Sequence, residues 1–122
     1  MTMARRGSLE HEIQKGFVDW FSLQYPRYRM LLFAVPNGGR RDSVTGSMLK
    51  AEGVTAGVSD LILFIPRKGY HGLCIETKTP KKTSRQSPSQ KEWQKAVEEQ
   101  GYKYEVCRSI DEFMATVNEY LS

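Results

Sequence analysis

Two carboxylates and a lysine, Asp60, Glu76 and Lys78, are spaced so that one β-hairpin would bring them together. The chain between them contains two apolar, β-rich runs, Leu61–Ile65 and Leu73–Ile75, joined by a basic turn with proline and glycine. This pattern predicts a hairpin, and alternation along its second strand places Glu76 and Lys78 on the same side. Two carboxylates held so close repel each other, which favours a divalent cation between them.

Such a group suits the metal-dependent hydrolysis of a phosphodiester. A hard cation would take oxygen ligands from Asp60, from Glu76 and from the backbone carbonyl of Ile75 or Thr77. The cation would polarise a phosphate oxygen and lower the pKa of a bound water. Lys78 could position that water and stabilise the charge that develops on the phosphorane.

The register of the hairpin depends on where its turn lies. A turn near the centre of the tip, residues 66–72, places Asp60 opposite either Glu76 or Lys78, with Cβ atoms roughly 4.5–5.5 Å apart. The tip is either exposed or a contact between two copies of the chain. His71 belongs to this tip and is therefore too far from the carboxylates to act with them.

A third acid stands on the first predicted helix, which runs from about Leu9 to Gln24 with Ser8 as its N-cap. Apolar residues recur on it at helical spacing and form the buried stripe: Leu9, Ile13, Phe17, Trp20 and Phe21. At 100° per residue, Glu10 lies about 60° from the centre of that stripe and Glu12 about 100° away on the other flank. Glu10 therefore borders the core, whereas Glu12 points more toward solvent and is the alternative.

Basic residues lie in two loops beside this predicted site. An apolar strand over Met30–Val35 is followed by a Pro-Asn-Gly-Gly loop that ends in Arg40 and Arg41, and then by a short helix over 43–52. A second loop, residues 79–87, is polar, and we expect it to be mobile. Its cations are Lys81, Lys82 and Arg85. Side chains from both loops could contact DNA phosphates.

Ser87 and Pro88 begin the next helix, as N-cap and first helical residue, and this helix runs to about Gln100. Gln90 lies in its first turn, near the point where the loop returns from Lys78. From there it could orient Lys78 or the attacking water.

The predicted order of elements is α-β-α-β-β-α-β-α, which ends with a strand over Tyr102–Cys107 and a helix over about 110–121. Ser109 and Glu112 form a capping box for that helix, whose apolar stripe is Phe113, Val117 and Leu121. This order predicts an α/β fold, a mixed sheet flanked by helices. At 122 residues we expect one domain, residues 1–122, with a short basic tail over 1–7.

The composition allows a polyanionic partner and excludes several other classes. Eighteen Lys and Arg against 14 Asp and Glu give a net charge of +4. Cys74 and Cys107 belong to no Cys/His cluster, so we expect buried, reduced thiols and neither a zinc site nor a disulfide. The chain shows no apolar run approaching 18 residues and no signal peptide, so we expect a cytoplasmic protein without a membrane span.

The order of these motifs resembles the virus-type replication-repair nuclease (VRR-NUC) domain, a branch of the PD-(D/E)xK nuclease superfamily. The shared order is a helix acid, an Asn-Gly-Gly loop, Gly-Val-Ser-Asp, Ile-Glu-Thr-Lys and Ser-Pro-Ser-Gln. The most specific parts are Glu52–Phe64 and Ile75–Lys78, within a resemblance that covers roughly residues 8–106. The departure is Ser59, where the motif usually has proline, and it affects backbone shape rather than ligation.

The resemblance implies a restriction-endonuclease-like core and a role for each matching residue. It makes Asp60 and Glu76 metal ligands and Lys78 the catalytic lysine. It matches Gln90 to the helix glutamine and Glu10 to the first-helix acid.

The resemblance further implies an Mg²⁺- or Mn²⁺-dependent DNA endonuclease that acts on branched DNA such as Holliday junctions. Stand-alone members resemble phage or bacterial structure-specific nucleases that form symmetric homodimers, which suits paired cuts related by a two-fold axis. Three alternatives stay open: a nuclease acting on flaps or forks, a non-catalytic nucleic-acid-binding module, and an interaction protein with an incidental ion pair in its hairpin.

Overall fold

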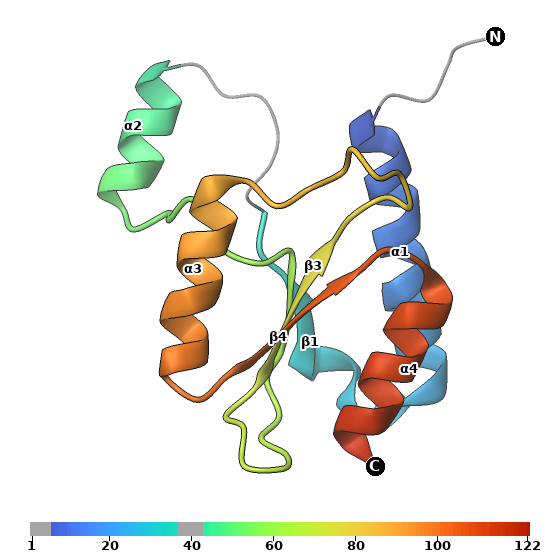
Figure 1. The fold of residues 1–122 in the computed structure, drawn as a ribbon. Coiled ribbons are helices and arrows are strands. Elements are labelled where there is room, and N and C mark those ends of the chain that lie inside the picture. Colours follow the sequence, from blue (N-terminus) through green and yellow to red (C-terminus); the bar gives the residue numbers. More distant parts are fainter. Residues whose placement is uncertain (1–5, 37–42) are drawn as a thin grey trace, which may run out of the picture.

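The computed structural model describes residues 6–36 and 43–122, and the strands of these residues form one mixed sheet (Figure 1). In spatial order the strands are β1 (Leu32–Ala34), β2 (Leu61–Leu63), β3 (Leu73–Thr77) and β4 (Lys103–Cys107). β2 is antiparallel to both β1 and β3, and β4 runs parallel to β3. A parallel pair needs a crossover, which α3 (Pro88–Glu99) supplies.

Helices cover the two faces of the sheet unequally. α1 (Arg6–Gln24) and α4 (Ile110–Leu121) pack together on one face, and α3 lies on the other (Figure 1). α2 (Ser43–Ala51) stands away from the sheet, and a 3-10 helix, η1 (Pro26–Leu31), links α1 to β1. The predicted α/β fold with a mixed sheet and this order of helices and strands is therefore confirmed.

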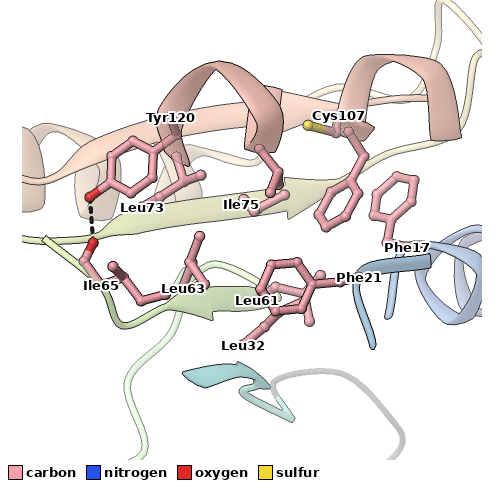
Figure 2. Packing of buried hydrophobic residues seen from close by; sticks show 12 residues of the cluster. Phe17, Phe21, Leu32, Leu61, Leu63, Ile65, Leu73, Ile75, Cys107 and Tyr120 are labelled. Atoms are coloured by element: carbon pink, nitrogen blue, oxygen red, sulfur yellow. Dashed lines mark hydrogen bonds between the residues drawn. The ribbon is translucent and has the colours of Figure 1, made fainter. Parts of the chain in front are cut away.

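The core fills the space between the sheet and the two helices α1 and α4 (Figure 2). Phe17 and Phe21 of α1 are fully buried, and the ring of Phe17 stacks on that of Phe113 in α4, with centroids 4.4 Å apart. The hydroxyl of Tyr120 donates to the carbonyl of Ile65 at 2.7 Å, which satisfies the polar end of a buried ring (Figure 2). The predicted apolar stripes of both helices thus face the sheet.

The pairing of β2 with β3 decides which residue faces Asp60. Leu61 pairs with Ile75 at the open end of the hairpin, so the next position outward on the two strands is Asp60 and Glu76. Of the two predicted registers, the structure has the one that opposes the two carboxylates. Lys78 lies two residues further on, on the same side of the strand as Glu76.

The tip of the hairpin packs against the C-terminal end of α4. Its turn consists of Lys68 (φ 52°) and Gly69 (φ 84°), both left-handed, as the type I′ form of a two-residue hairpin turn requires. The Lys68 ammonium donates to the Ser122 hydroxyl at 3.1 Å and lies 3.8 Å from the Glu119 carboxylate. The tip therefore has partners within the chain, at the end of the hairpin opposite the carboxylates.

The predicted strand over Met30–Val35 is wrong in its first two residues. Pro26 starts the 3-10 helix, which takes up the first residues of this run, and only Leu32–Ala34 pairs with β2. β1 is an edge strand with an open face, which leaves Phe33 42% exposed, and Met30 in the 3-10 helix before it is 83% exposed. This continuous apolar run therefore marks an edge with an uncovered face rather than a strand buried on both sides.

The first helix begins earlier than predicted, at Arg6. Ser8 is therefore a helical residue, and its prediction as the N-cap is wrong. The predicted basic tail over 1–7 overlaps this helix by two residues, and its residues 1–5 lie outside the described part of the chain. The predicted end of the second helix is nearly right, since α2 stops at Ala51 and Gly53 follows with φ 106°.

The last helix keeps its predicted N-cap but not the full capping box. The hydroxyl of Ser109 accepts from the backbone N–H of Glu112 at 3.2 Å. The Glu112 carboxylate accepts instead from the backbone N–H of Arg108 at 2.7 Å, one residue before the cap. Within the apolar stripe, Tyr120 is fully buried and the predicted Leu121 only partly.

Cys74 and Cys107 are buried free thiols, as predicted. Burial raises the pKa of both thiols to about 11, so they are protonated at neutral pH. Of the helices in the described residues, none is both long enough and apolar enough to cross a membrane.

Candidate active site

Two carboxylates meet at the open end of the hairpin. Asp60 directly precedes β2, and its Oδ2 accepts a hydrogen bond from the backbone N–H of Thr77 at 2.8 Å. This bond crosses between the strands and holds Asp60 beside Glu76. Glu76 lies on β3, which is buried along its whole length, and only 1% of the residue is exposed.

Each oxygen of Glu76 faces a neutral hydrogen-bond donor. The Gln90 side-chain NH₂ donates to Oε2 at 3.0 Å, and the Tyr104 hydroxyl donates to Oε1 at 3.4 Å. Gln90 comes from α3 and Tyr104 from β4. The carboxylate is thus held between two elements that follow it in the chain.

The surroundings of Glu76 oppose its negative charge. Burial first, and then the hydrogen bond and charge of Asp60, raise the pKa of Glu76 to about 9. The Lys78 ammonium acts in the opposite direction. A cation between the two carboxylates would remove the repulsion and let both ionise.

The start of α3 places Gln90. Ser87 caps this helix, since its hydroxyl accepts from the backbone N–H of Gln90 at 3.2 Å. In return the Gln90 Oε1 accepts from the backbone N–H of Ser87 at 2.8 Å. This reciprocal capping box occupies the amide oxygen and leaves the NH₂ group for Glu76. The sequence suggests that Gln90 orients Lys78 or water, whereas its contacts here are with Glu76 and Ser87.

Gly57 brings the segment before β2 against the first turn of α3. Its backbone is left-handed, with φ 86°. A Cβ at this position would overlap the backbone carbonyl of Ser89 and would lie 2.9 Å from the backbone nitrogen of Gln90. Only glycine allows this approach, which sets Asp60 and Gln90 on neighbouring walls of the site.

A cavity of about 550 Å³ opens over these side chains. Asp60, Glu76 and Gln90 line it, together with Glu10 from α1. The other walls come from α2, the segment 54–58 and the first residues of α3. Glu10 therefore faces the cavity, whereas Glu12 is exposed and is not among its lining residues.

The sequence model of the VRR-NUC domain matches residues 6–111, which is most of the chain. This chain belongs to the VRR-NUC family. A solved structure described as a VRR_NUC domain protein superposes with a TM-score of 0.80 at 27% identity, over 99% of this chain and 90% of that chain. A comparison with curated protein sequences finds no significant match.

Membership makes this VRR-NUC domain a nuclease, an enzyme that hydrolyses DNA. Nucleases of this kind generally use divalent metal ions. Within residues 6–36 and 43–122, no three His, Cys, Asp or Glu side chains cluster closely enough to hold a metal by themselves. The pair Asp60 and Glu76 nevertheless fits Mg²⁺, which is commonly bound through one or two carboxylates, with water and substrate phosphate as further ligands.

Lys78, the lysine of the VRR-NUC motif, lies near Glu76 but is not among the residues that line the cavity. Its backbone N–H donates to the Cys107 carbonyl at 3.1 Å, which continues the β3–β4 pairing past the end of β3. Only 9% of the residue is exposed. Its charge lowers the pKa of Glu76, so the ammonium acts on that carboxylate.

Hydrogen bonds hold the first residue of the loop over residues 79–87, Thr79, in place. The Arg108 guanidinium donates to the carbonyl of Thr79 at 2.9 Å, and the Ser84 hydroxyl accepts from the backbone N–H of Thr79 at 3.2 Å. Ser84 itself is only 1% exposed. The predicted mobility of this loop does not hold for its base, because two buried or partly buried bonds tie Thr79 to its neighbours.

The cations predicted to contact DNA divide into two groups. Three are exposed on this loop: Lys81, Lys82 and Arg85. The other two, Arg40 and Arg41, lie outside the described residues. The exposed group stands in the segment that directly follows Lys78, which suits contact with the phosphates on either side of a cleaved bond.

Tyr104 is a residue of this VRR-NUC site that the sequence analysis missed. A tyrosine in the middle of a predicted strand is a signal, since a buried hydroxyl needs a hydrogen-bond partner. In the structure Tyr104 is paired with Cys74, two residues before Glu76, and it points to the same face of the sheet. No turn fixes the register of a parallel pair, so the sequence could not align Tyr104 with Glu76.

Proposed function

We propose that this VRR-NUC domain is an Mg²⁺- or Mn²⁺-dependent endonuclease that cuts branched DNA, such as four-way Holliday junctions. The observation that supports this most is the pair of opposed carboxylates, Asp60 and Glu76, on the wall of a cavity of about 550 Å³. Glu76 is buried, and its pKa is raised to about 9. A bound divalent cation would lower this pKa and favour the ionised carboxylate.

The side chains divide the chemistry among them. A bound divalent ion would polarise the scissile phosphate and lower the pKa of a water. Asp60 and Glu76 would hold that ion, with the backbone carbonyl of Ile75 or Thr77. Lys78 would position the attacking water and stabilise the negative charge that develops on the phosphate oxygens.

Two further residues support the carboxylates. Gln90 orients Glu76 through its 3.0 Å hydrogen bond. Glu10 faces the same cavity from α1 and would add a third carboxylate toward the cation, directly or through a water. The role of Gln90 rests on its hydrogen bond to Glu76, and the role of Glu10 rests on its position in the cavity wall.

The proposed substrate follows from how the DNA would be held. Lys81, Lys82 and Arg85, with Arg40 and Arg41, would contact phosphates, and such contacts carry no sequence information. Selection by the shape of the DNA is then favoured over selection by base sequence. We place the enzyme in the cytoplasm of a bacterial or phage-infected cell, as a homodimer whose two-fold axis relates paired cuts.

A panel of labelled DNAs tests this proposal. Four-way junctions, flaps, forks and linear duplexes are incubated with the protein in Mg²⁺, Mn²⁺ or EDTA. We expect cleavage of the junction in either metal, none in EDTA, and none by Asp60→Asn or Glu76→Gln. Light scattering of the purified protein measures whether it is a dimer.

Other outcomes would correct particular parts of the proposal. Preferred cutting of flaps or forks would show that the proposed substrate is wrong and would leave the proposed metal-dependent cleavage unchanged. Cutting by a variant that carries both Asp60→Asn and Glu76→Gln would rule out this site. Salt-sensitive DNA binding without Mn²⁺ binding or cleavage would make the chain a non-catalytic binding module.

A further inference from the structure

A partly buried polar network reaches Glu76 from the side of the sheet edge at β4. Gln86, near the end of the 79–87 loop, donates through its NH₂ group to Gln94 Oε1 at 2.8 Å and to the Tyr104 hydroxyl oxygen at 3.2 Å. Tyr104 donates in turn to Glu76 Oε1 at 3.4 Å. A loop, a helix and two strands thus meet behind one carboxylate.

The network fixes the direction in which the Tyr104 hydroxyl donates. The amide of Gln86 is set by the carbonyl of Gln94, so its NH₂ group faces Tyr104 as a donor. The phenol oxygen must then accept from Gln86, and its own hydrogen is left for Glu76. Gln94 is oriented as well, because its NH₂ group donates to Glu98 at 3.3 Å.

Packing holds the ring of Tyr104 in place. Tyr104 is 5% exposed, and its ring centroid lies 6.2 Å from that of Trp93 on α3. The hydroxyl and the Gln90 amide donate to different oxygens of Glu76, so rotation of the carboxylate would break both bonds. The Tyr104 bond, at 3.4 Å, is longer than the 2.5–3.0 Å usual for hydroxyl donors.

We propose that Tyr104, aimed by Gln86, is a positioning residue that holds Glu76 in the orientation in which it binds the metal. The inference rests on the proposed function, because it takes Glu76 to be a metal ligand. Loss of a group that orients a metal ligand in this way typically costs about 10–100-fold in metal affinity or activity.

Two variants and one matched control test the inference. Tyr104→Phe removes the hydroxyl and keeps the ring against Trp93. Gln86→Met removes the donor that aims the hydroxyl. Tyr102→Phe is the control, since its ring packs on His71 and its hydroxyl has no contact with Glu76.

The measurements are the dissociation constant for Mn²⁺, by calorimetry without DNA, and the dependence of junction cleavage on Mn²⁺ concentration. We expect Tyr104→Phe to raise the Mn²⁺ dissociation constant by about tenfold and to keep the cleavage rate at saturating Mn²⁺. Gln86→Met should shift the constant in the same direction by less, and Tyr102→Phe should match the wild type.

A Tyr104→Phe protein that keeps its fold and its Mn²⁺ affinity would overturn the inference, as would an equal loss of affinity in Tyr102→Phe. If Tyr104→Phe does not fold, Gln86→Met decides by the same criterion. A wild-type protein that neither binds Mn²⁺ nor cleaves DNA would instead refute the proposed function and the inference with it.

Discussion

At the scale of single residues, Glu76 combines burial with a second carboxylate next to it. Burial excludes the water that would solvate its charge, and Asp60 repels that charge directly. Its partners Gln90 and Tyr104 are neutral donors and do not neutralise it. Glu76 therefore holds a proton at neutral pH until a cation arrives, and metal binding should release that proton.

The protein without metal should lose stability as the pH rises. Glu76 has a pKa of about 9 in the folded state against its usual 4.5, so between these values the folded state binds more protons than the unfolded one. The stabilisation is complete below about pH 4.5 and is lost as the pH rises toward about 9. The loss should be on the order of a few kcal/mol, because one pKa unit corresponds to about 1.4 kcal/mol.

Thermal melting in EDTA between about pH 5 and about pH 9 measures this loss. Glu76→Gln is the matched variant, since its amide has nearly the same shape and does not titrate. Its melting temperature should fall less with pH than that of the wild type. Parallel curves for the two proteins would show that Glu76 is not the group responsible.

Lys78 should affect catalysis far more than metal binding. Lys78→Met keeps most of the aliphatic stem and removes the ammonium that would stabilise the developing negative charge. We expect a decrease in kcat of roughly 10²–10³-fold, as for other single groups of this kind, with Mn²⁺ affinity close to that of the wild type. Glu76→Gln, by contrast, should lose both cleavage activity and Mn²⁺ affinity. A kcat for Lys78→Met near the wild-type value would exclude the proposed role.

At the scale of elements, the site depends on a close approach between the segment before β2 and the first turn of α3. Gly57 forms this contact with the backbone of Ser89 and Gln90. The capping box of Ser87 and Gln90 then fixes the start of the helix. The backbone contact at Gly57 therefore brings Asp60 and Gln90 to neighbouring walls of the site, and neither side chain takes part in it.

Gly57→Ala should disturb the site far more than Gly53→Ala. Both glycines are left-handed, with φ 86° and 106°, so an alanine at either position costs about 1–2 kcal/mol. At Gly53 the added methyl meets open space, whereas at Gly57 it overlaps Ser89 and should cost about 1–3 kcal/mol more. Denaturant unfolding gives both values, and cleavage assays should show lost activity for Gly57→Ala alone. Equal effects at the two positions would mean that the contact with α3 is unimportant.

Much of this framework could be predicted from the sequence, because local rules decide it. The stripe of Phe17 and Phe21 follows from helical spacing, and the same arithmetic directs Glu10 toward the core. The cap at Ser87 follows from the residues around it. The catalytic roles of these residues stay predictions, to be tested by the variants above.

The features that could not be predicted depend on contacts distant in the sequence. The open face of β1 exists because α3 packs against β4, at the opposite edge of the sheet. No local pattern in Met30–Val35 predicts this arrangement. Tyr104 meets Glu76 through the register of a parallel pair, which no turn sets. The fastening of Thr79 depends on Arg108, 29 positions away in the chain.

At the scale of the whole molecule, the two ends of the hairpin are separate. The carboxylates and the cavity lie at its open end. The tip contacts the C-terminal end of α4, and both lie at the lower end of the molecule in Figure 1. The exposed cations of the 79–87 loop belong to the carboxylate end. The net charge of +4 would attract DNA generally, and we expect the exposed cations of this loop to direct its phosphates to the site.

DNA binding should lose part of its salt dependence when the loop is neutralised. Each phosphate contact contributes about 0.9 to the slope of log affinity against log salt, so removing three contacts should reduce the slope by about 3. The variant is the triple substitution Lys81→Gln, Lys82→Gln and Arg85→Gln, measured by fluorescence anisotropy in EDTA. Lys68→Gln, at the hairpin tip, is the control and should leave the slope nearly unchanged. An unchanged slope in the triple variant would place the DNA elsewhere.

The double use of the Gln90 amide restricts what evolution or design can put at that position. Its oxygen serves the cap of α3 and its nitrogen serves Glu76. Glutamate would keep the cap but add a third negative charge, asparagine is one methylene too short, and methionine supplies neither bond. A library of all amino acids at position 90, selected for DNA cleavage, should therefore return glutamine almost alone, although the residue contacts neither water nor phosphate in the proposed mechanism.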